Sequence, residues 1–271
     1  MRFIYFVLLV SFLVLSTGTF DIANASGEGI FLQENFENYS FGTTEFPTIG
    51  EENCKKLAGC PDSTCPKKPL VVSRKHSKTG KKSLRFIFNK NNKVNHNNGY
   101  CAFRNEIRYD NLNLPYGSEA WFAWSLYPEV NYEKKIIPYM SNGDSWITQF
   151  KTASSGNTGG IQIRKNNKGY FFSTGKDGVN LGPVNFNKWN DIVIRLRYEG
   201  SDRGGRTIWL NGEKYFLPEA YENEGDLDFK LGLYGWQPDG RTIHYIDNVV
   251  IVKGASNYET MRNALNNSVS D

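Results

Sequence analysis

Short segments of alternating hydrophobic and polar residues dominate the chain, and they predict β-strands. The predicted strands, rich in β-branched and aromatic residues, are residues 84–88, 120–127, 146–151, 160–164, 191–198 and 245–252. Breaks rich in Asn, Gly and Lys separate them, at residues 89–99, 154–159, 165–169 and 201–205. Because these strands do not alternate with helices, the pattern predicts an all-β sandwich or barrel rather than a parallel sheet.

Residues 207–216 carry the strongest turn signal. Two hydrophobic runs flank Asn211-Gly212, a pair that tolerates the positive φ angles of a type I′ hairpin turn. A helical pattern is expected only near the C-terminus, where residues 257–265 are predicted to form one short helix. Since no repeat or linker divides the chain, we expect one domain over residues 26–254, followed by a tail over residues 255–271.

The N-terminal residues 1–25 are predicted to be a signal peptide. Arg2 precedes an apolar run that ends at Leu15, which is too short to span a bilayer comfortably. Ala23-Asn-Ala25 fits the pattern read by signal peptidase, so cleavage is expected before Ser26. An uncleaved membrane anchor is the alternative. The mature protein is expected to be soluble, secreted or periplasmic, and without membrane contact.

The chain has four cysteines, Cys54, Cys60, Cys65 and Cys101. Three of them lie in an insertion over residues 51–69 that is rich in Pro and Lys, and two disulfides are expected, one of them reaching Cys101. The spacing of the first three matches no common zinc pattern. The net charge of +4 is compatible with an anionic partner, and no basic tract with interleaved aromatic residues indicates nucleic-acid binding.

Several predicted strands carry polar residues at every second position, which places those residues on one sheet face. These residues are Arg104, Glu106 and Arg108; Gln149 and Lys151; Gln162 and Arg164; and Lys230 and Tyr234, with Gly232 between them. Each set alone is compatible with a solvated sheet face. Together they predict a groove of guanidinium, amide, ammonium and phenol groups suited to a sugar carboxylate, with Gly232 leaving room for a ligand.

Three of these motifs, in this order, resemble motifs of alginate lyases. Arg-Asn-Glu-Ile-Arg at residues 104–108 is similar to Arg-(Ser/Thr)-Glu-Leu-Arg, and Gln-Phe-Lys at 149–151 is similar to Gln-(Ile/Val)-His. Phe-Lys-Leu-Gly-Leu-Tyr-Gly-Trp at 229–236 resembles Tyr-Phe-Lys-Ala-Gly-x-Tyr-x-Gln. The resemblance implies a concanavalin A-like jelly-roll sandwich of two antiparallel sheets with a concave substrate cleft.

The sequence between these motifs resembles heparin lyases and glucuronan lyases. Framework segments at 121–128, 188–191, 209–212 and 245–249 are similar to theirs, and the resemblance runs over about residues 31–254. It implies a polysaccharide lyase that acts by β-elimination on a uronate polymer. Glucuronan, alginate and heparin-like chains all remain open as substrates.

The resemblance also implies roles for individual residues. Arg104 would bind the uronate carboxylate, Gln149 would donate a hydrogen bond beside it, and Glu106 would orient Arg104. Tyr234 would protonate the leaving O4 and, in a syn elimination, also take the C5 proton, which requires nearby cations that favour the phenolate. The expected substrate contacts are Glu106, Arg108, Gln162, Arg164 and Lys230.

One position departs from the relatives, which have a histidine where Lys151 stands. A lysine acts as a base only when burial or neighbouring positive charge favours its neutral form, so Lys151 is either a base or a carboxylate contact. His96, eight residues before Arg104, is a further candidate base, whereas His76 and His244 are weaker ones. The base is therefore left open among Lys151, His96 and Tyr234.

Two other functions compete with the lyase. A sandwich-fold glycoside hydrolase would need paired carboxylates, but the common Glu-x-Asp-x-x-Glu pattern is missing from the sequence and Glu106 stands between two arginines. A non-catalytic carbohydrate-binding module would keep Arg104 but would not need Tyr234 opposite Gln149. No cofactor is expected to be required, a structural calcium ion is left open, and the protein is expected to be a monomer.

Overall fold

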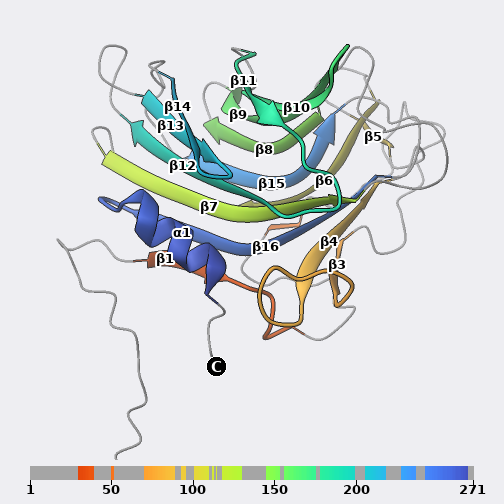
Figure 1. Cartoon of the computed structure of the whole chain (residues 1–271), viewed down its shortest axis with the longest axis horizontal. Helices are drawn as coiled ribbons and strands as arrows, with labels where there is room; N and C mark the ends of the chain where they lie inside the picture. The colour runs from red at the N-terminus through yellow and green to blue at the C-terminus, as the bar shows by residue number, and fades with distance from the viewer. Residues whose placement is uncertain are drawn as a thin grey trace, which may run out of the picture.

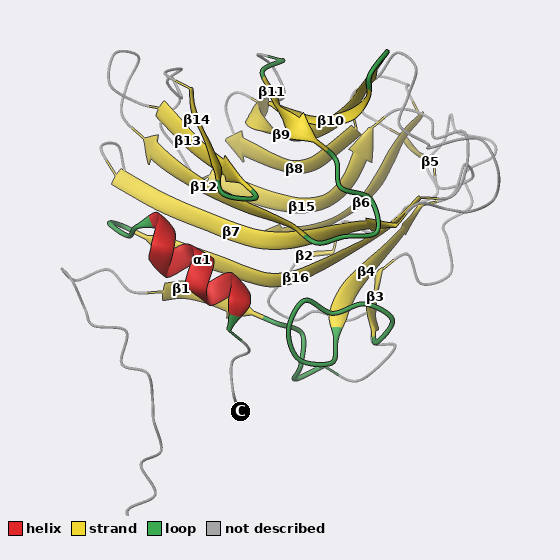
Figure 2. Ribbon diagram, in the orientation of Figure 1, coloured by secondary structure: helices red, strands yellow, loops and turns green. Residues whose placement is uncertain are grey.

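The structure is a computed structural model that describes residues 30–39, 50–51, 70–88, 93–95, 101–109, 112, 114, 118–129, 145–152, 156–174, 178–198, 205–217, 227–235 and 242–267. These residues form two antiparallel β-sheets and a single α-helix (Figures 1 and 2). The predicted signal peptide, most of the cysteine-rich insertion and His96 lie outside the described residues. The side chain of Cys101 does too, so the disulfides remain a prediction.

The first sheet has the strand order β14-β13-β12-β7-β16-β4-β3, and β1 also pairs with β16. Its strands are β1 (Ile30–Glu34), β3 (Leu70–Ser73), β4 (Ser83–Phe88), β7 (Ser118–Glu129), β12 (Asn190–Tyr198), β13 (Gly205–Leu210), β14 (Glu213–Leu217) and β16 (Thr242–Lys253). β1 and β4 can share β16 because they pair with different halves of it. The result is a layer whose central strands are β7 and β16.

The second sheet has the order β11-β10-β9-β8-β15-β6-β2, and β5 also pairs with β6. Its strands are β2 (Gly50–Glu51), β5 (Lys93–Asn95), β6 (Cys101–Tyr109), β8 (Ser145–Thr152), β9 (Gly156–Asn166), β10 (Gly169–Thr174), β11 (Asn180–Pro183) and β15 (Leu227–Gly235). The long strands β7, β8, β15 and β16 bend in the same sense (Figure 1). The predicted sandwich of antiparallel sheets is confirmed.

Every strand predicted from the hydrophobic pattern is present, and so is the hairpin. Asn211 and Gly212 have φ angles of 51° and 93°, as a type I′ turn requires. Two of the predicted breaks overlap strands only at their ends, because β9 ends at Asn166 and β10 begins at Gly169 within 165–169, and β13 begins at Gly205. The other two were wrong over more of their length, because β5 lies inside 89–99 and β9 begins at Gly156 inside 154–159. In both places the backbone finds a pairing partner, β6 or β8, so tertiary pairing overrides a local composition that disfavours strands.

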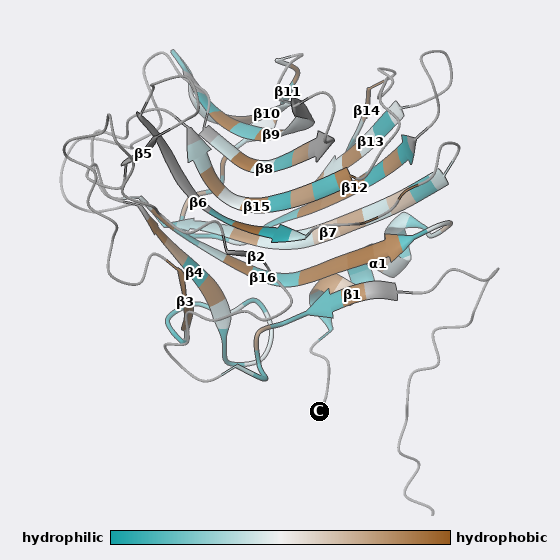
Figure 3. Ribbon diagram, turned by 180° about the vertical axis from the view of Figure 1, so that it is seen from behind, coloured by the Kyte–Doolittle hydropathy of each residue, from teal (hydrophilic) through white to brown (hydrophobic). Residues whose placement is uncertain are grey.

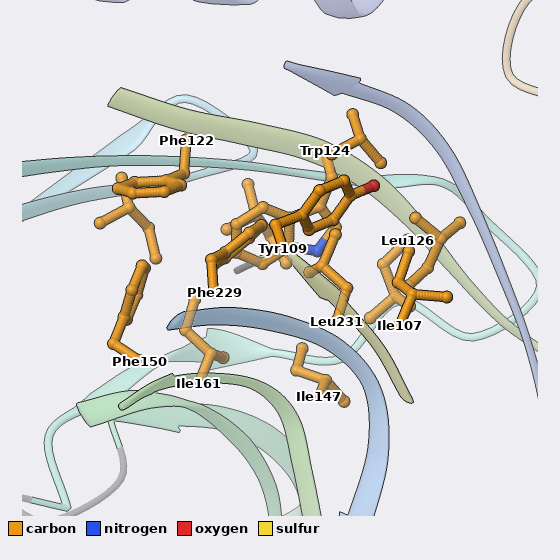
Figure 4. Packing of buried hydrophobic residues seen from close by; sticks show 14 of the residues in the cluster. Ile107, Tyr109, Phe122, Trp124, Leu126, Ile147, Phe150, Ile161, Phe229 and Leu231 are labelled. Atoms are coloured by element: carbon orange, nitrogen blue, oxygen red, sulfur yellow. The ribbon is translucent and has the colours of Figure 1, made fainter. Parts of the chain in front are cut away.

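Aromatic side chains from both sheets fill the space between the layers (Figure 4). The Phe122 ring on β7 lies 5.0 Å from Phe150 on β8 and 4.7 Å from Phe229 on β15, measured between ring centroids. Trp124 completes the contact with Phe229 at 5.6 Å. Such rings contribute both large buried area and edge-to-face attraction, so this cluster fixes how the second sheet sits on the first.

The predicted C-terminal helix is present as α1 (Tyr258–Asn266), and its N-cap Asn257 accepts a hydrogen bond from the backbone N–H of Thr260 at 2.9 Å. It packs on the outer face of the first sheet, where Met261 and Leu265 are fully buried (Figure 2). β16 is therefore covered on both faces and is hydrophobic along most of its length (Figure 3). Within the described ranges, no helix is long and apolar enough to cross a membrane.

A buried carboxylate ties the loop before β4 to the outer face of the first sheet. Asp247 is fully buried and accepts backbone hydrogen bonds from Lys78 (2.7 Å), Thr79 (3.4 Å) and Asn248 (2.9 Å). The Lys78 ammonium also binds both carboxylate oxygens of Asp191, at 3.1 and 2.9 Å. Burial raises the pKa of Asp247 to about 7, and the three backbone bonds only partly oppose that effect.

This raised pKa predicts that stability falls as the pH rises from about 4 to about 7. In that window unfolded Asp247 loses its proton while folded Asp247 keeps it, so the unfolded state binds fewer protons. The full shift corresponds to about 4 kcal/mol of unfolding free energy. In urea unfolding between pH 4 and pH 8, wild type should lose this stability relative to Asp247→Asn, which cannot titrate. Parallel pH profiles for the two proteins would contradict this assignment.

Candidate active site

The second sheet carries a polar face on the side opposite the core. On β6, Ile107 lies in the core cluster while Glu106 belongs to the other face, and on β15 Leu231 and Leu233 are core residues that flank Gly232. The alternation predicted from the sequence is therefore confirmed for these two strands. The same rule places Gln162 on the polar face of β9, because its neighbours 161 and 163 are core residues.

The strand register sorts the polar residues into rows that run across the sheet. The first row, from β6 to β10, is Arg104, Tyr234, Trp146, Gln162 and Ser173. The second row is Arg108, Lys230, Gln149 and Gly160. Asp228 and Lys151 pair with each other two residues beyond the second row, on the side away from the first row. Facing positions in adjacent strands have Cβ atoms about 5 Å apart, so neighbours within a row can contact the same ligand.

Two β-bulges leave a bare patch between the first and second rows. The register shifts between β15 and β8 at residues 231–234, and between β8 and β9 at residues 146–148. Ile147 lies in the core, and Thr148 pairs with the core-facing positions Leu231 and Ile161. With Gly232 on β15, the strands β15, β8 and β9 present no side chain between the two rows. We call this area, defined by Gly232 and residues 147–148, the bare patch.

The register differs from the expected placement of Gln149 opposite Tyr234. Trp146 pairs with Tyr234, while Gln149 pairs with Lys230, three residues further along β8. At about 3.3 Å per residue, that step is about 10 Å. The register of β15 on β8 causes the difference, because regular pairing from Lys230 and Gln149 would already put Ser145 opposite Tyr234, and the bulge moves that partner by one residue to Trp146. Gln149 and Tyr234 consequently lie on opposite borders of the bare patch.

Lys151 lies further away from Tyr234. It is five residues along β8 from Trp146, which corresponds to about 16 Å. Its register partner is Asp228, whose carboxylate binds the Arg108 guanidinium at 2.7 Å. The side chain of Lys151 itself lies outside the described residues, as does that of Arg104. The register thus brings Arg104 together with Tyr234 and does not bring Lys151 to them.

Several polar groups along the bare patch are enclosed by protein. Glu106, Gln149, Gln162 and Lys230 are between 0% and 4% exposed. The Thr148 hydroxyl donates to the backbone carbonyl of Lys230 at 2.8 Å, and Arg164 Nε donates to Gln162 Oε1 at 3.0 Å. Among the described residues, Gln149 Oε1 and Gln162 Nε2 have no hydrogen-bond partner. Buried polar atoms normally have partners, so these two amides are candidate hydrogen-bonding groups for a ligand.

The comparison with protein families decides between the candidate functions. A family model described as polysaccharide lyase matches residues 39–250, most of the chain. The chain belongs to the polysaccharide lyase family. It is therefore a polysaccharide lyase rather than a glycoside hydrolase or a non-catalytic binding module. No curated protein sequence matches the chain significantly.

Solved structures show the same jelly-roll fold for this lyase. An endo-β-1,4-glucuronan lyase from the fungus Trichoderma reesei matches with a TM-score of 0.55 and 16% identity, covering 84% of this chain and 96% of that chain. Alginate lyase Aly36B matches with a TM-score of 0.55 and 14% identity, covering 81% of this chain and 95% of that one. Identities this low support the fold alone, which is the jelly-roll sandwich predicted from the sequence.

Two histidines of the lyase lie away from the polar face. His76 stacks on Tyr127 at 4.2 Å and contacts Tyr245 edge-on at 4.8 Å, which places it on the first sheet. His244 is buried in β16, and burial lowers its pKa to about 3, so its imidazole is neutral. His96 lies outside the described residues. Among the described residues of the second sheet, the polar face offers Tyr234, Glu106, Lys230 and Asp228 as titratable groups, and Tyr234 is the one that pairs with Arg104.

Sequence reasoning did not select Trp146, Ser173 or Asp228 as site residues. Trp146 is half-buried between Tyr234 and Gln162 in the first row, and Ser173 is fully buried at the end of that row. Asp228 alternates with Lys230 on β15, which was the signal that could have identified it. Within the described ranges, no three His, Cys, Asp or Glu side chains are grouped as metal ligands, and structural calcium remains an open prediction.

Proposed function

We propose that this lyase cleaves a uronate-containing polysaccharide by β-elimination, with Tyr234 as acid and base. The observation that carries the proposal is the register pair Tyr234 and Arg104 at the border of the bare patch. Arginine binds carboxylates through two parallel hydrogen bonds, and its positive charge favours the phenolate form of a neighbouring tyrosine. A phenolate beside a bound carboxylate is the arrangement that elimination from a uronate requires.

The proposed reaction is a syn elimination in which one proton moves from carbon to oxygen. The Tyr234 phenolate takes the C5 proton while the electron pair of the C5–H bond forms the C4=C5 double bond. The C4–O4 bond breaks, and the phenol returns the proton to the departing O4. Arg104 and Gln149 stabilise the charge that develops on the uronate carboxylate, which preorganised donors achieve best at low dielectric.

The second row is proposed to bind the polymer on one side of the reacting sugar. Arg108 and Lys230 place positive charge there, and Lys151 lies two residues beyond. Neighbouring uronates carry the carboxylates that these cations would contact. Two structural neighbours are described as glucuronan lyase and alginate lyase. We therefore propose glucuronan or polymannuronate as the polymer, since their geometry permits elimination by one tyrosine, with heparin-like chains as the alternative.

The first experiment incubates the mature protein with glucuronan, polymannuronate, polyguluronate and heparin separately. An unsaturated uronate absorbs in the ultraviolet, so a rise in absorbance measures elimination directly. We expect a rise with glucuronan or polymannuronate. Cleavage without that absorbance would overturn the elimination, and a rise only with polyguluronate would overturn the mechanism with one tyrosine.

Lys151→His tests whether position 151 takes part in proton transfer. Because Lys151 lies about 16 Å from the Tyr234 row, we expect KM to rise about tenfold and kcat to stay within about twofold. Steady-state kinetics on the best polymer measure both constants. A clear rise in kcat with unchanged KM would instead identify position 151 as the base.

Export, disulfides and composition of the active species are also proposals. We propose that the signal peptide is cleaved before Ser26 and that the exported protein has two disulfides, one of which includes Cys101. We also propose that the protein is a monomer and is active without an added cofactor. Mass spectrometry of the exported protein, before and after reduction, checks the cleavage site and the disulfides. Light scattering checks the monomer, and activity after dialysis against a chelator checks the role of any metal.

A further inference from the structure

Gln162 lies on the same row as the proposed catalytic tyrosine. In the register, Trp146 separates it from Tyr234, so two strand spacings, about 10 Å, lie between their Cα atoms. Gln162 is also a diagonal neighbour of Gln149, because Gln149 pairs with Gly160, two residues before Gln162. Such diagonal neighbours are about 7 Å apart. Gln162 therefore lies on the same border of the bare patch as Tyr234, two strands away on β9.

A hydrogen bond from Arg164 fixes the orientation of the Gln162 amide. Arg164 Nε donates to Gln162 Oε1 at 3.0 Å. Since a guanidinium is only a donor, the atom that faces it must be the amide oxygen. The Nε2 group consequently points away from Arg164, and among the described residues it has no hydrogen-bond partner although Gln162 is 0% exposed. An oriented, unpaired N–H donor is left on the polar face.

The β10–β11 turn limits the positions that Arg164 can occupy. At Gly178, whose φ is +66°, a Cβ atom would lie 3.1 Å from Arg164 Nη1, so the turn backbone approaches the guanidinium closely. Glycine tolerates this positive φ without strain. The guanidinium is thus bordered by Gly178 on one side and by the Gln162 amide oxygen on another.

We infer that Gln162 is a second amide of the reaction centre, which donates from Nε2 to the carboxylate of the uronate bound over Trp146, and that Arg164 is its positioning residue. The inference rests on the proposed function. The reacting sugar would lie on the bare patch beside the row that holds Tyr234, Trp146 and Gln162, with Gln149 on the opposite border. Because Gln162 is enclosed, neighbouring half-exposed side chains such as Trp146 must shift when substrate binds, as side chains at binding sites commonly do.

The first test compares kcat and KM of Gln162→Ala with wild type. Loss of a preorganised donor to developing charge lowers kcat by about 100-fold, and this is the result we expect. Gln162→Glu places an acceptor where the carboxylate binds, so it should lower kcat/KM at least as far as Gln162→Ala. Wild-type kcat in Gln162→Ala would overturn the inference.

The second test is a double-mutant cycle between Gln162 and Arg164. Arg164→Met should lower kcat by roughly 10- to 100-fold in the wild-type background and by less than about twofold in the Gln162→Ala background, because a positioning residue acts only through its partner. Gly178→Ala, which crowds Arg164, should reproduce part of the loss. Lys168→Met, an exposed charge on the same hairpin, controls for electrostatics and should retain wild-type constants. Additive effects of Gln162→Ala and Arg164→Met would overturn the positioning role.

Binding measurements separate failure of this inference from failure of the proposed elimination. In the Tyr234→Phe background, Gln162→Ala should weaken binding of a uronate oligosaccharide at least tenfold, whatever reaction the enzyme performs. Ultraviolet-active product from wild type, together with unchanged binding and turnover in Gln162→Ala, would overturn the inference and leave the elimination intact. If wild type binds none of the four acidic polymers, both proposals are overturned.

Discussion

Tyr234→Phe is expected to lower kcat by at least about 1,000-fold while leaving polysaccharide affinity nearly unchanged. The substitution removes one oxygen and keeps the ring on β15, so packing on the polar face is preserved. General acid–base catalysis contributes about 100- to 10,000-fold, and Tyr234 is proposed to perform both the acid and the base step. Ultraviolet absorbance of the product measures turnover, and calorimetric titration with a uronate oligosaccharide measures affinity.

Tyr215→Phe is the matched control for this experiment. Tyr215 lies on β14 of the first sheet, where its hydroxyl is near Gly182 rather than the polar face. It should retain wild-type turnover. If Tyr234→Phe lowers affinity and turnover by equal factors, Tyr234 serves to hold the substrate or the fold, and the proposed proton transfer is wrong.

Gly160→Ala is expected to have the largest effect on stability. A Cβ at this position would lie 2.1 Å from the backbone oxygen of Thr148, and Gly160 has a φ of +147°. Because that oxygen belongs to the backbone and not to a flexible side chain, the β8–β9 pairing must separate. We expect a loss of at least about 3 kcal/mol in unfolding free energy, or about 6–12 °C in Tm for a chain of this size.

Gly169→Ala separates the clash from the backbone strain. Gly169 also has a positive φ, +124°, but a Cβ atom added there would meet no other atom within 4 Å. The unfolding free energy of Gly169→Ala should therefore fall only by the cost of the unfavourable φ, about 1–3 kcal/mol. The variant should remain clearly more stable than Gly160→Ala. Equal Tm values for the two variants would show that the approach of Thr148 to Gly160 does not matter.

The faces of the strands could be predicted from sequence because side chains alternate with a strict period of two. Glu106 and Ile107 fall on the expected faces of β6, and Lys230 and Leu231 fall on those of β15. The family motifs added the jelly-roll fold and the enzyme class. What the alternation cannot supply is the register between strands, because pairing depends on contacts made across the sheet.

The strand register shows why the site was only partly predictable. Nothing in the local sequence at residues 146–149 indicates that Gln149 pairs with Lys230, or that an extra residue of β15 brings Trp146 opposite Tyr234. β10 was missed for a related reason, since Gly169 was read as a break although the strand starts there and pairs with β9. Trp146 and Ser173 became visible as site neighbours only through these pairings.

The bulges between these strands also bear on where the enzyme can accept an insertion or a deletion. Between the Lys230 row and the Tyr234 row, β15 advances four residues, β8 three and β9 two. Beyond the bulge, β15 and β8 pair regularly over residues 227–231 and 148–152, whereas β8 and β9 have a second register shift between Phe150 and Lys151. An insertion or deletion in this short interval can therefore be absorbed without displacing the strands on either side. This interval is therefore a place where the substrate-facing surface can be reshaped while the rest of the sandwich keeps its register.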